Sequence, residues 1–167
     1  ELDVIVYATG FDAMTGALTR IDVRGRDGLS LKDVWATEGP ISYLGLAVAG
    51  FPNLFTVQGP GAPAAATNFV AALEQHVEWI GECLSHLHAG GHRTIEALPA
   101  AQSEWIDLTA SLVAPTVLVH PSCNSWYNGG NVPGKKRLYM GYVGGIPEYR
   151  RQCDEIAAAG YTGFKLG

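Results

Sequence analysis

The sequence predicts an α/β fold, and three features of the chain support that prediction. A short β-branched run at residues 4–8 ends at Thr9-Gly10, which is typical of a buried strand that leads into a turn. Residues 67–88 repeat apolar side chains at helical spacing. The chain has 167 residues, 47% hydrophobic and 16% charged, so it can bury a substantial core.

Residues 3–8 are expected to form a strand of the parallel type, because apolar side chains follow one another without alternation. Such a strand needs neighbouring strands on both edges and cover on both faces. The chain enters this run directly from Glu1-Leu2, with no initiator methionine. We therefore expect the chain to be a cut piece of a larger fold.

Four short segments in the first third of the chain are expected to be strands. Residues 20–24 alternate apolar and polar side chains, and a glycine turn separates them from residues 31–35, so this region predicts a hairpin-like structure. Residues 44–49 and 54–57 are predicted to be two further strands, joined by a turn at residues 50–53.

The clearest predicted element is a helix over residues 67–88. Either Thr67 or Asn68 suits its N-cap, and Gly90-Gly91 suits its end. Apolar side chains share one stripe of this helix, which is expected to be amphipathic. The stripe consists of Phe69, Leu73, Val77, Ile80 and Leu84.

The second half of the chain predicts two more helices and a strand. Residues 100–113 have a polar start and an apolar side, as a helix on a core requires. Residues 138–143 read as a strand, and residues 147–160 as a helix that opens with proline. Residues 161–166 are expected to be a terminal extension.

Between these elements, residues 120–136 are rich in Pro, Gly, Asn and Ser and predict a loop. The loop also contains Trp126 and Tyr127, whose large side chains have no regular element to join. We expect such a loop to be either pinned to the fold or mobile for a functional reason.

Composition excludes several classes of function. Eleven basic against sixteen acidic residues give a net charge of -5, which argues against nucleic-acid binding. The apolar runs are too short to span a membrane, and no secretory signal is visible. Cys83, Cys123 and Cys153 lack metal-binding spacing, so reduced thiols and a cytoplasmic location are expected. The histidines have no spacing that suggests a triad or a metal site; they are His76, His86, His88, His92 and His120.

Two glycine-containing turns have the form that presents backbone N–H groups to a pyrophosphate or a flavin ring. One lies at residues 8–12, after the first strand, and the other is Gly59-Pro60-Gly61, which leads into the long helix. Neither is a complete dinucleotide fingerprint, and each can also be an ordinary turn.

Residues 3–12 resemble the strand and ATG-F-D element of flavoprotein monooxygenases. Residues 53–61 and 68–80 are similar to the Baeyer-Villiger subgroup, and residues 125–135 match the mobile control loop of cyclohexanone and phenylacetone monooxygenases. Further matches extend to the end of the chain, at residues 142–145, 149–150, 153–154 and 160–164. Similarity to steroid monooxygenase is part of the same resemblance.

This resemblance implies the C-terminal part of a fold with two dinucleotide-binding domains of Rossmann type, for FAD and NADP. Residues 1–90 would complete the FAD-binding domain, and residues 91–167 would form a helical segment with the control loop. The reaction implied uses FAD, NADPH and O2 to insert one oxygen next to a ketone carbonyl, giving an ester or lactone. The family's glycine-rich fingerprints and its catalytic arginine precede the ATG element, so the isolated chain is expected to be inactive.

The resemblance also implies roles for individual residues, none of them catalytic. Thr9 and Gly10 would lie beside the cofactors through their backbone, and Asp12 would fix the turn. Asn68 and Phe69 would approach the flavin, and Trp126 would close over NADP through its indole N–H. The substrate pocket would be lined by small side chains that leave room for a bulky ketone, namely Ala64, Ala65, Ala66 and Thr67.

Other interpretations remain open. Thr9-Gly10 can simply end a strand, residues 64–66 can lead into a helix, and Phe69 can equally be a core residue. The chain can be a non-catalytic binding or interaction domain, which would have to cover an exposed apolar face, for example by self-association. It can also belong to an N-hydroxylating or sulfoxidising flavin monooxygenase, which shares the ATG element.

Overall fold

The computed structural model describes residues 2–8, 10–64 and 67–167, and its described part mixes helices with short strands, as the α/β class requires. The helices are α1 (Gly16–Thr19), α2 (Leu31–Glu38), α3 (Phe69–Ala89), α4 (Pro99–Val113) and α5 (Ile146–Ala158). The strands are β1 (Ala62–Pro63), β2 (Ile95–Ala97), β3 (Gly141–Tyr142) and β4 (Phe164–Leu166). Single turns of 3-10 helix are η1 (Arg26–Gly28), η2 (Val117–Val119) and η3 (Trp126–Asn128).

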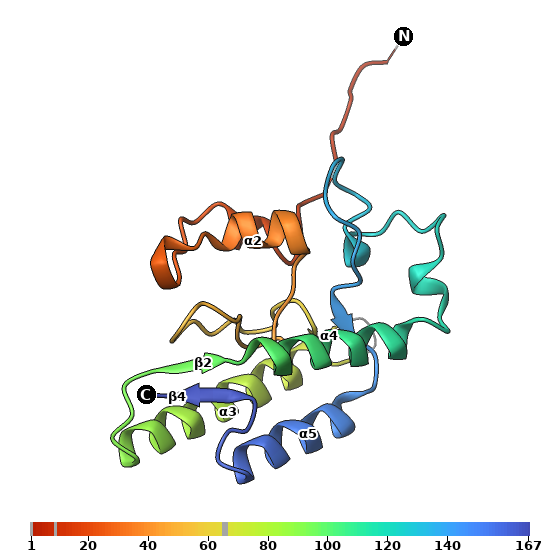
Figure 1. Cartoon of the computed structure of the whole chain (residues 1–167). Coiled ribbons are helices and arrows are strands. Elements are labelled where there is room, and N and C mark those ends of the chain that lie inside the picture. The colour runs from red at the N-terminus through yellow and green to blue at the C-terminus, as the bar shows by residue number, and fades with distance from the viewer. Residues whose placement is uncertain (1, 9, 65–66) are drawn as a thin grey trace.

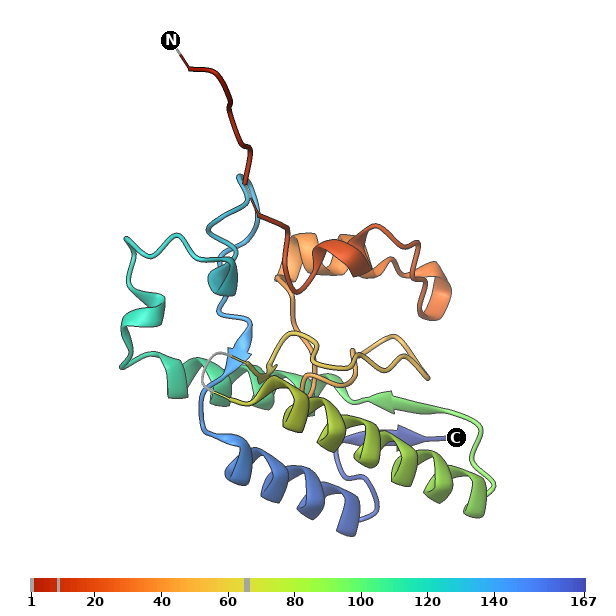
Figure 2. The same cartoon turned by 180° about the vertical axis from the view of Figure 1, so that it is seen from behind.

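The three long helices and the β2–β4 pair form one body (Figures 1 and 2). The α1–α2 region and the long loop before β3 lie on the other side of α4, and residues 2–8 project away from the rest of the chain. β1 pairs with β3 in parallel, with Ala62 opposite Gly141, while β2 pairs with β4 in antiparallel register. None of the helices in the described ranges is long and apolar enough to cross a membrane.

Helix α3 begins and ends within two residues of the predicted range of 67–88. The side chain of Asn68 caps its start by accepting hydrogen bonds from the N–H groups of Val70 and Ala71, and Gly90 is the C-cap residue. The apolar stripe expected on this helix is not its buried face, however, because Phe69, Val77 and Leu84 are exposed. The buried face consists of Ala72, Gln75, His76, Trp79, Cys83 and Leu87.

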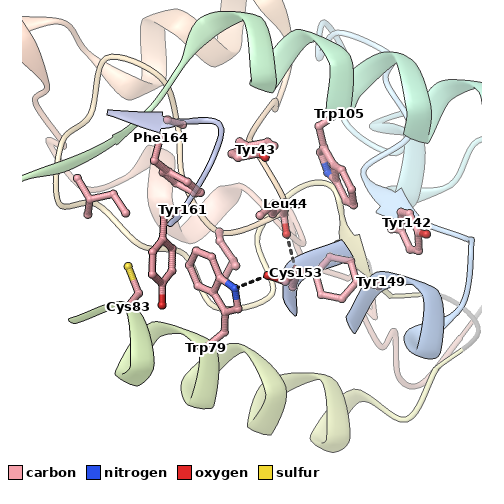
Figure 3. Packing of buried hydrophobic residues seen from close by; sticks show 14 of the residues in the cluster. Tyr43, Leu44, Trp79, Cys83, Trp105, Tyr142, Tyr149, Cys153, Tyr161 and Phe164 are labelled. Atoms are coloured by element: carbon pink, nitrogen blue, oxygen red, sulfur yellow. Dashed lines mark hydrogen bonds between the residues drawn. The ribbon is translucent and has the colours of Figure 1, made fainter. Parts of the chain in front are cut away.

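This buried face of α3 packs into an aromatic core (Figure 3). The Trp79 ring lies 5.2 Å from the ring of Tyr161 and 5.8 Å from that of Phe164, measured between centroids. On α4, the Trp105 ring stacks on Tyr142 of β3 at 5.3 Å. Aromatic pairs in these geometries contribute about 0.5–1.5 kcal/mol each beyond the area they bury. The core therefore ties α3 and α4 to residues near the end of the described chain.

The predictions for the second half are largely confirmed. Helix α4 begins at Pro99 and ends at Val113, close to the predicted range, and α5 is likewise close to its predicted range. The predicted strand at residues 138–143 is reduced to β3. The expected terminal extension contains strand β4, which pairs with β2. The sequence predicted neither strand. Both strands are only three residues long, and strands of that length have little periodicity.

The predicted strand at residues 3–8 is wrong for this structure. These residues belong to no strand, and the side chains of Val4, Val6 and Tyr7 are exposed. A parallel strand is held by hydrogen bonds to its neighbours, and no strand of the described residues pairs with this segment. Extended propensity alone therefore does not produce a strand here.

The predicted hairpin at residues 20–24 and 31–35 is also wrong. Only an isolated bridge joins Arg24 to Ser30, and Leu31 begins helix α2. The side chain of Ser30 accepts a hydrogen bond from the N–H of Asp33, which satisfies one free donor at the start of the helix. This local cap favours a helix at residues 31–38, whereas the alternation that indicated a hairpin lies in residues 20–24.

Residues 44–49 and 54–57 form no strands, although the turn between them is present. Leu44 has φ +60° and Asn53 also has φ +60°, which is the left-handed region and not extended backbone. Residues 44–48 are nevertheless buried, and Tyr43 and Ala47 form an isolated bridge. These residues are buried but lack strand geometry, so their apolar content wrongly indicated strands.

Candidate functional site

The loop at residues 120–136 is irregular, as predicted, and internal hydrogen bonds shape the turn that carries Trp126. The Ser125 hydroxyl accepts a hydrogen bond from the N–H of Tyr127, and Gly129 follows in a left-handed conformation. The Trp126 ring stacks on Tyr127 with centroids 3.7 Å apart and keeps 38% of its surface exposed. The Tyr127 carbonyl accepts a hydrogen bond from the N–H of Met140, which anchors the turn beside β3.

The same loop contacts the glycine turn near the start of the chain. Lys135 forms an ion pair with Asp12, and the side-chain amide of Asn131 donates to the carbonyl of Phe11 at 3.4 Å. Lys135 is mostly buried, with 14% of its side chain exposed. The structure thus brings Asp12 onto the loop that carries Trp126. Gly10 has φ +78° and open space where a side chain would be, whereas Thr9 lies outside the described residues.

We expect Lys135→Met to loosen this contact without unfolding the chain. A partly exposed ion pair contributes up to about 1 kcal/mol, so hydrogen exchange at the amides of residues 129–135 should become about two- to fivefold faster. Mass spectrometry of exchanged peptides measures this change. Lys165→Met, on β4, is the matched control and should leave these amides unchanged. Equal exchange in Lys135→Met and the unmodified chain would show that the ion pair does not hold the loop.

The second group of predicted site residues lies at the start of α3. Asn68 acts as the N-cap, and Phe69 leaves 52% of its surface exposed, so the interpretation of Phe69 as a core residue of this chain is wrong. The Thr67 hydroxyl donates to the carbonyl of the half-buried Ala64 at 3.3 Å. Ala65 and Ala66, also predicted to line the pocket, lie outside the described residues.

These two groups are connected through the β1–β3 pair. β1 immediately precedes Ala64, and β3 follows the loop of Trp126, so their parallel pairing places the end of this loop beside the Pro60-Gly61 turn and Ala64 at the opposite end of the pair. No hydrogen bond or ring contact joins Trp126 to Asn68 or Phe69 in the described part of the structure. The arrangement offers the positive end of a 21-residue helix, an exposed aromatic ring and a second ring on a loop. Such groups suit the binding of a planar cofactor with anionic character.

A buried polar network lies beside this site and was not predicted. His76 is fully buried, and its Nδ1 accepts a hydrogen bond from the backbone N–H of Gln58 at 3.1 Å. Nδ1 therefore carries no proton, and Nε2–H donates to the Tyr149 hydroxyl at 2.8 Å. That hydroxyl donates in turn to the Leu44 carbonyl at 2.5 Å (Figure 3).

The network keeps both of its titratable side chains neutral. Burial lowers the pKa of His76 to about 4 and raises the pKa of Tyr149 well above its usual value. The sequence prediction for His76 concerned only the spacing of a triad or a metal site, and the hydrogen-bond partners of its ring come from distant segments. Ala72 and His76 are four residues apart and therefore lie on the same face of α3, which is the buried face. This helical spacing is the signal that could have shown that His76 is buried. No cluster in the described ranges has three or more His, Cys, Asp or Glu side chains placed to hold a metal ion.

Comparisons with known proteins give consistent matches, although no protein-family model matches the chain. Acetone monooxygenase (methyl acetate-forming) from Gordonia sp. (strain TY-5) is 48% identical over 99% of this chain and 31% of its own length. The crystal structure of cyclohexanone monooxygenase from Rhodococcus sp. Phi1 bound to NADP+ is 41% identical, with a TM-score of 0.91 over 99% of this chain and 30% of that one. Phenazine N-monooxygenase from Lysobacter antibioticus is 37% identical over 99% of this chain and 30% of its own length. The chain thus spans about 30% of the length of the curated relatives it matches.

Proposed function

We propose that this chain, which is homologous to a segment of the Baeyer-Villiger flavin monooxygenases, is part of an enzyme that uses FAD, NADPH and O2 to insert an oxygen next to a ketone carbonyl. The product would be an ester or a lactone. The observation that carries this proposal is the agreement with an NADP-bound cyclohexanone monooxygenase over 99% of the chain, in both sequence and fold. Relatives named for acetone and cyclohexanone support a ketone as the substrate.

The proposal assigns the residues of this chain to binding and covering the cofactors, not to chemical steps. The start of α3, with Asn68 and the exposed Phe69, would hold FAD, and Gly10 and Thr9 would approach the cofactors through their backbone. The geometry fits, because a positive helix end and an exposed ring suit an anionic planar group. When bound, FAD supplies the oxygen-transfer chemistry. Asp12 would fix the glycine turn, by its ion pair to Lys135, while Trp126 would cover NADP.

The substrate pocket would begin at the segment between β1 and α3. Ala64 and Thr67, with Ala65 and Ala66, are small side chains, and this favours a bulky ketone. We also propose the division of the chain into residues 1–90, as part of the FAD-binding domain, and 91–167, as the segment with the control loop. The free thiols of Cys83, Cys123 and Cys153 fit a cytoplasmic protein.

Activity should require the parts of the enzyme that this chain does not align with. The relatives are about three times longer, since the chain covers only 31% of acetone monooxygenase. The exposed apolar side chains on α3 would pack against those parts, and in the isolated chain they favour self-association. Stoichiometric FAD in the purified 167-residue chain, together with NADPH-dependent ester formation, would refute this requirement.

Trp126→Phe, introduced into the longer enzyme that contains this sequence, tests the proposal. The substitution keeps a ring but removes the indole N–H, and one hydrogen bond contributes about 0.5–1.5 kcal/mol. The KM for NADPH should therefore rise about three- to tenfold, measured by NADPH oxidation with ester formation from a ketone. Tyr127→Phe keeps Trp126 and should leave the KM unchanged. An unaltered KM in Trp126→Phe would remove the assigned role.

A second candidate function is N-oxygenation of an aromatic heterocycle. The relative named phenazine N-monooxygenase matches the chain over the same 99% as the ketone-oxidising relatives, so similarity alone does not separate the two reactions. Parallel assays with a cyclic ketone and with phenazine, each using the longer enzyme and NADPH, distinguish them. Turnover of phenazine without turnover of any ketone would favour N-oxygenation.

A further inference from the structure

The hydrogen bond between Gln58 and His76 closes a segment of chain that contains the proposed site. His76 lies on the buried face of α3, and its Nδ1 accepts this bond from the Gln58 N–H at 3.1 Å. Between the two residues lie the positions assigned to the substrate pocket and to the flavin contact of α3, which are residues 64–67, Asn68 and Phe69. The bond therefore joins the two ends of the segment on which the site is built.

Gln58 has a backbone conformation that needs such support. Its φ of +57° lies in the left-handed region, which costs free energy for a residue other than glycine. Gln58 is buried, and its own side-chain amide has no hydrogen-bond partner in the described part of the chain. Directly after it, the N–H of Gly59 donates to the carbonyl of Gly45 at 3.1 Å. The ring of His76 thus holds a closely packed turn at its strained residue.

Tyr149 connects His76 to a second turn of the same kind. The Tyr149 hydroxyl accepts from Nε2 of His76 and donates to the carbonyl of Leu44, whose φ is +60°. At the next residue, Gly45, an added Cβ would come within 2.5 Å of the Cβ of Ala62 in β1. The two side chains therefore support two left-handed turns that pack closely beside β1.

A pair of apolar side chains would not give this arrangement. Two apolar rings in place of His76 and Tyr149 would fill a similar volume, but the buried N–H of Gln58 would lose its partner. The polar atoms of both side chains are paired, and a buried network of this kind specifies one arrangement of the segments that it joins. These segments are the turn at Gln58, the turn at Leu44, α3 and α5.

We propose that His76 and Tyr149 are positioning residues, which set the path of the chain between Gln58 and Asn68 and thereby the shape of the substrate pocket. The pocket rests on the proposed function, whereas the hydrogen bonds belong to the 167-residue chain alone. Measurements on this chain and on the longer enzyme therefore test the two parts of the proposal separately.

Two substitutions of His76 each keep one half of its contacts. In His76→Asn the amide oxygen takes the place of Nδ1 and can accept from Gln58, whereas the longer side chain of His76→Gln takes the place of Nε2 and reaches Tyr149. Hydrogen exchange followed by NMR of the 15N-labelled chain should be about three- to tenfold faster at the amides within residues 58–62 in His76→Gln, and nearly unchanged in His76→Asn. Amides of residues 105–109 report global opening, so the acceleration beyond theirs measures the local effect.

The longer enzyme that contains this sequence gives the second measurement. With cyclohexanone and NADPH, the KM for the ketone should rise about three- to tenfold in His76→Gln and stay close to that of the unmodified enzyme in His76→Asn. Tyr149→Phe loses the bonds to His76 and Leu44 and should also raise this KM. A role in stability alone would lower the amount of active enzyme, and so kcat, without moving KM. His88→Gln, at an exposed position of α3, is the matched control and should change neither measurement.

The two measurements fail in different ways. Equal exchange within residues 58–62 in His76→Asn and His76→Gln would overturn the role of His76 in the turn. An unchanged KM for cyclohexanone in His76→Gln would overturn the positioning of the pocket. If the unmodified longer enzyme turns over no ketone, the proposed function fails, while exchange in the chain alone still decides whether His76 holds the turn.

Discussion

Trp79→Ala is expected to lower the free energy of unfolding of this chain by about 3–5 kcal/mol. The indole is 3% exposed and packs against Tyr161 and Phe164. Its N–H donates to the Cys153 carbonyl at 3.0 Å, which joins α3 to α5 (Figure 3). Substitution leaves a large cavity and removes the hydrogen bond that the Cys153 carbonyl accepts in addition to its bond within α5. Because small domains are stable by only about 5–15 kcal/mol, the loss should be clear in urea unfolding followed by circular dichroism.

Two further substitutions on α3 test whether the loss of stability comes from the buried face of this helix. Trp79→Phe keeps most of the ring contacts but loses the hydrogen bond to Cys153, so its cost should be about 1–3 kcal/mol. Val77→Ala lies on the opposite face, where Val77 is 60% exposed, and should change stability by less than about 0.5 kcal/mol. If Val77→Ala were the more damaging variant, the buried face of α3 would be the stripe expected from the sequence and not the one in the structure.

Acidification from pH 7.5 to pH 5 is expected to remove about 2 kcal/mol of stability through His76 alone. The pKa of His76 is about 4 in the folded chain, below the ordinary value of about 6.5 that it regains on unfolding. The unfolded chain therefore binds the proton more readily. The contribution of His76 is fully present above about pH 6.5 and declines as pH falls toward about 4.

The measurement is urea unfolding at several pH values for the unmodified chain and for His76→Gln. Glu96 also has a lowered pKa, held down mainly by its hydrogen bond with Arg26, but it titrates below the chosen window. His76→Gln should be less stable at pH 7.5, because the network with Tyr149 is disturbed, and its stability should change much less between pH 7.5 and pH 5. The same pH dependence in both proteins would exclude His76 as its source.

The ends of the long helices could be predicted from the sequence because they depend on local interactions. Asn68 and Gly90 cap α3 through contacts within a few residues, and Pro99 fits the first turn of α4 for the same reason. The buried face of α3 could not be predicted. Apolar residues occur on both sides of this helix, and the side that the core covers is decided by α5, β4 and residues 43–47.

Short strands and strained turns were beyond prediction for a different reason. β2 and β4 are defined by pairing with each other across most of the second half of the chain, and neither is long enough to show alternation. Residues 3–8 illustrate the converse, because a strongly strand-like sequence has no strand partner among the described residues. Leu44 adopts a left-handed backbone conformation that its side chain does not favour.

The site was predicted in part. The turn at Asp12 and the loop of Trp126 were recognised as separate motifs, and the structure joins them through Lys135. Proximity of this kind depends on tertiary structure, so sequence spacing could not reveal it. The same holds for His76, whose partners Gln58, Tyr149 and Leu44 come from other segments of the chain.

The hydrogen bond from Tyr149 to Leu44 spans 105 positions of sequence, which has a consequence for synthesis on the ribosome. At about 5–20 residues per second, residues 44–48 emerge roughly 5–20 s before the tyrosine that completes their environment. During that interval a nascent chain carries apolar residues that cannot yet be buried in their native place. Translation speed and chaperone binding in this window should therefore affect the yield of folded protein.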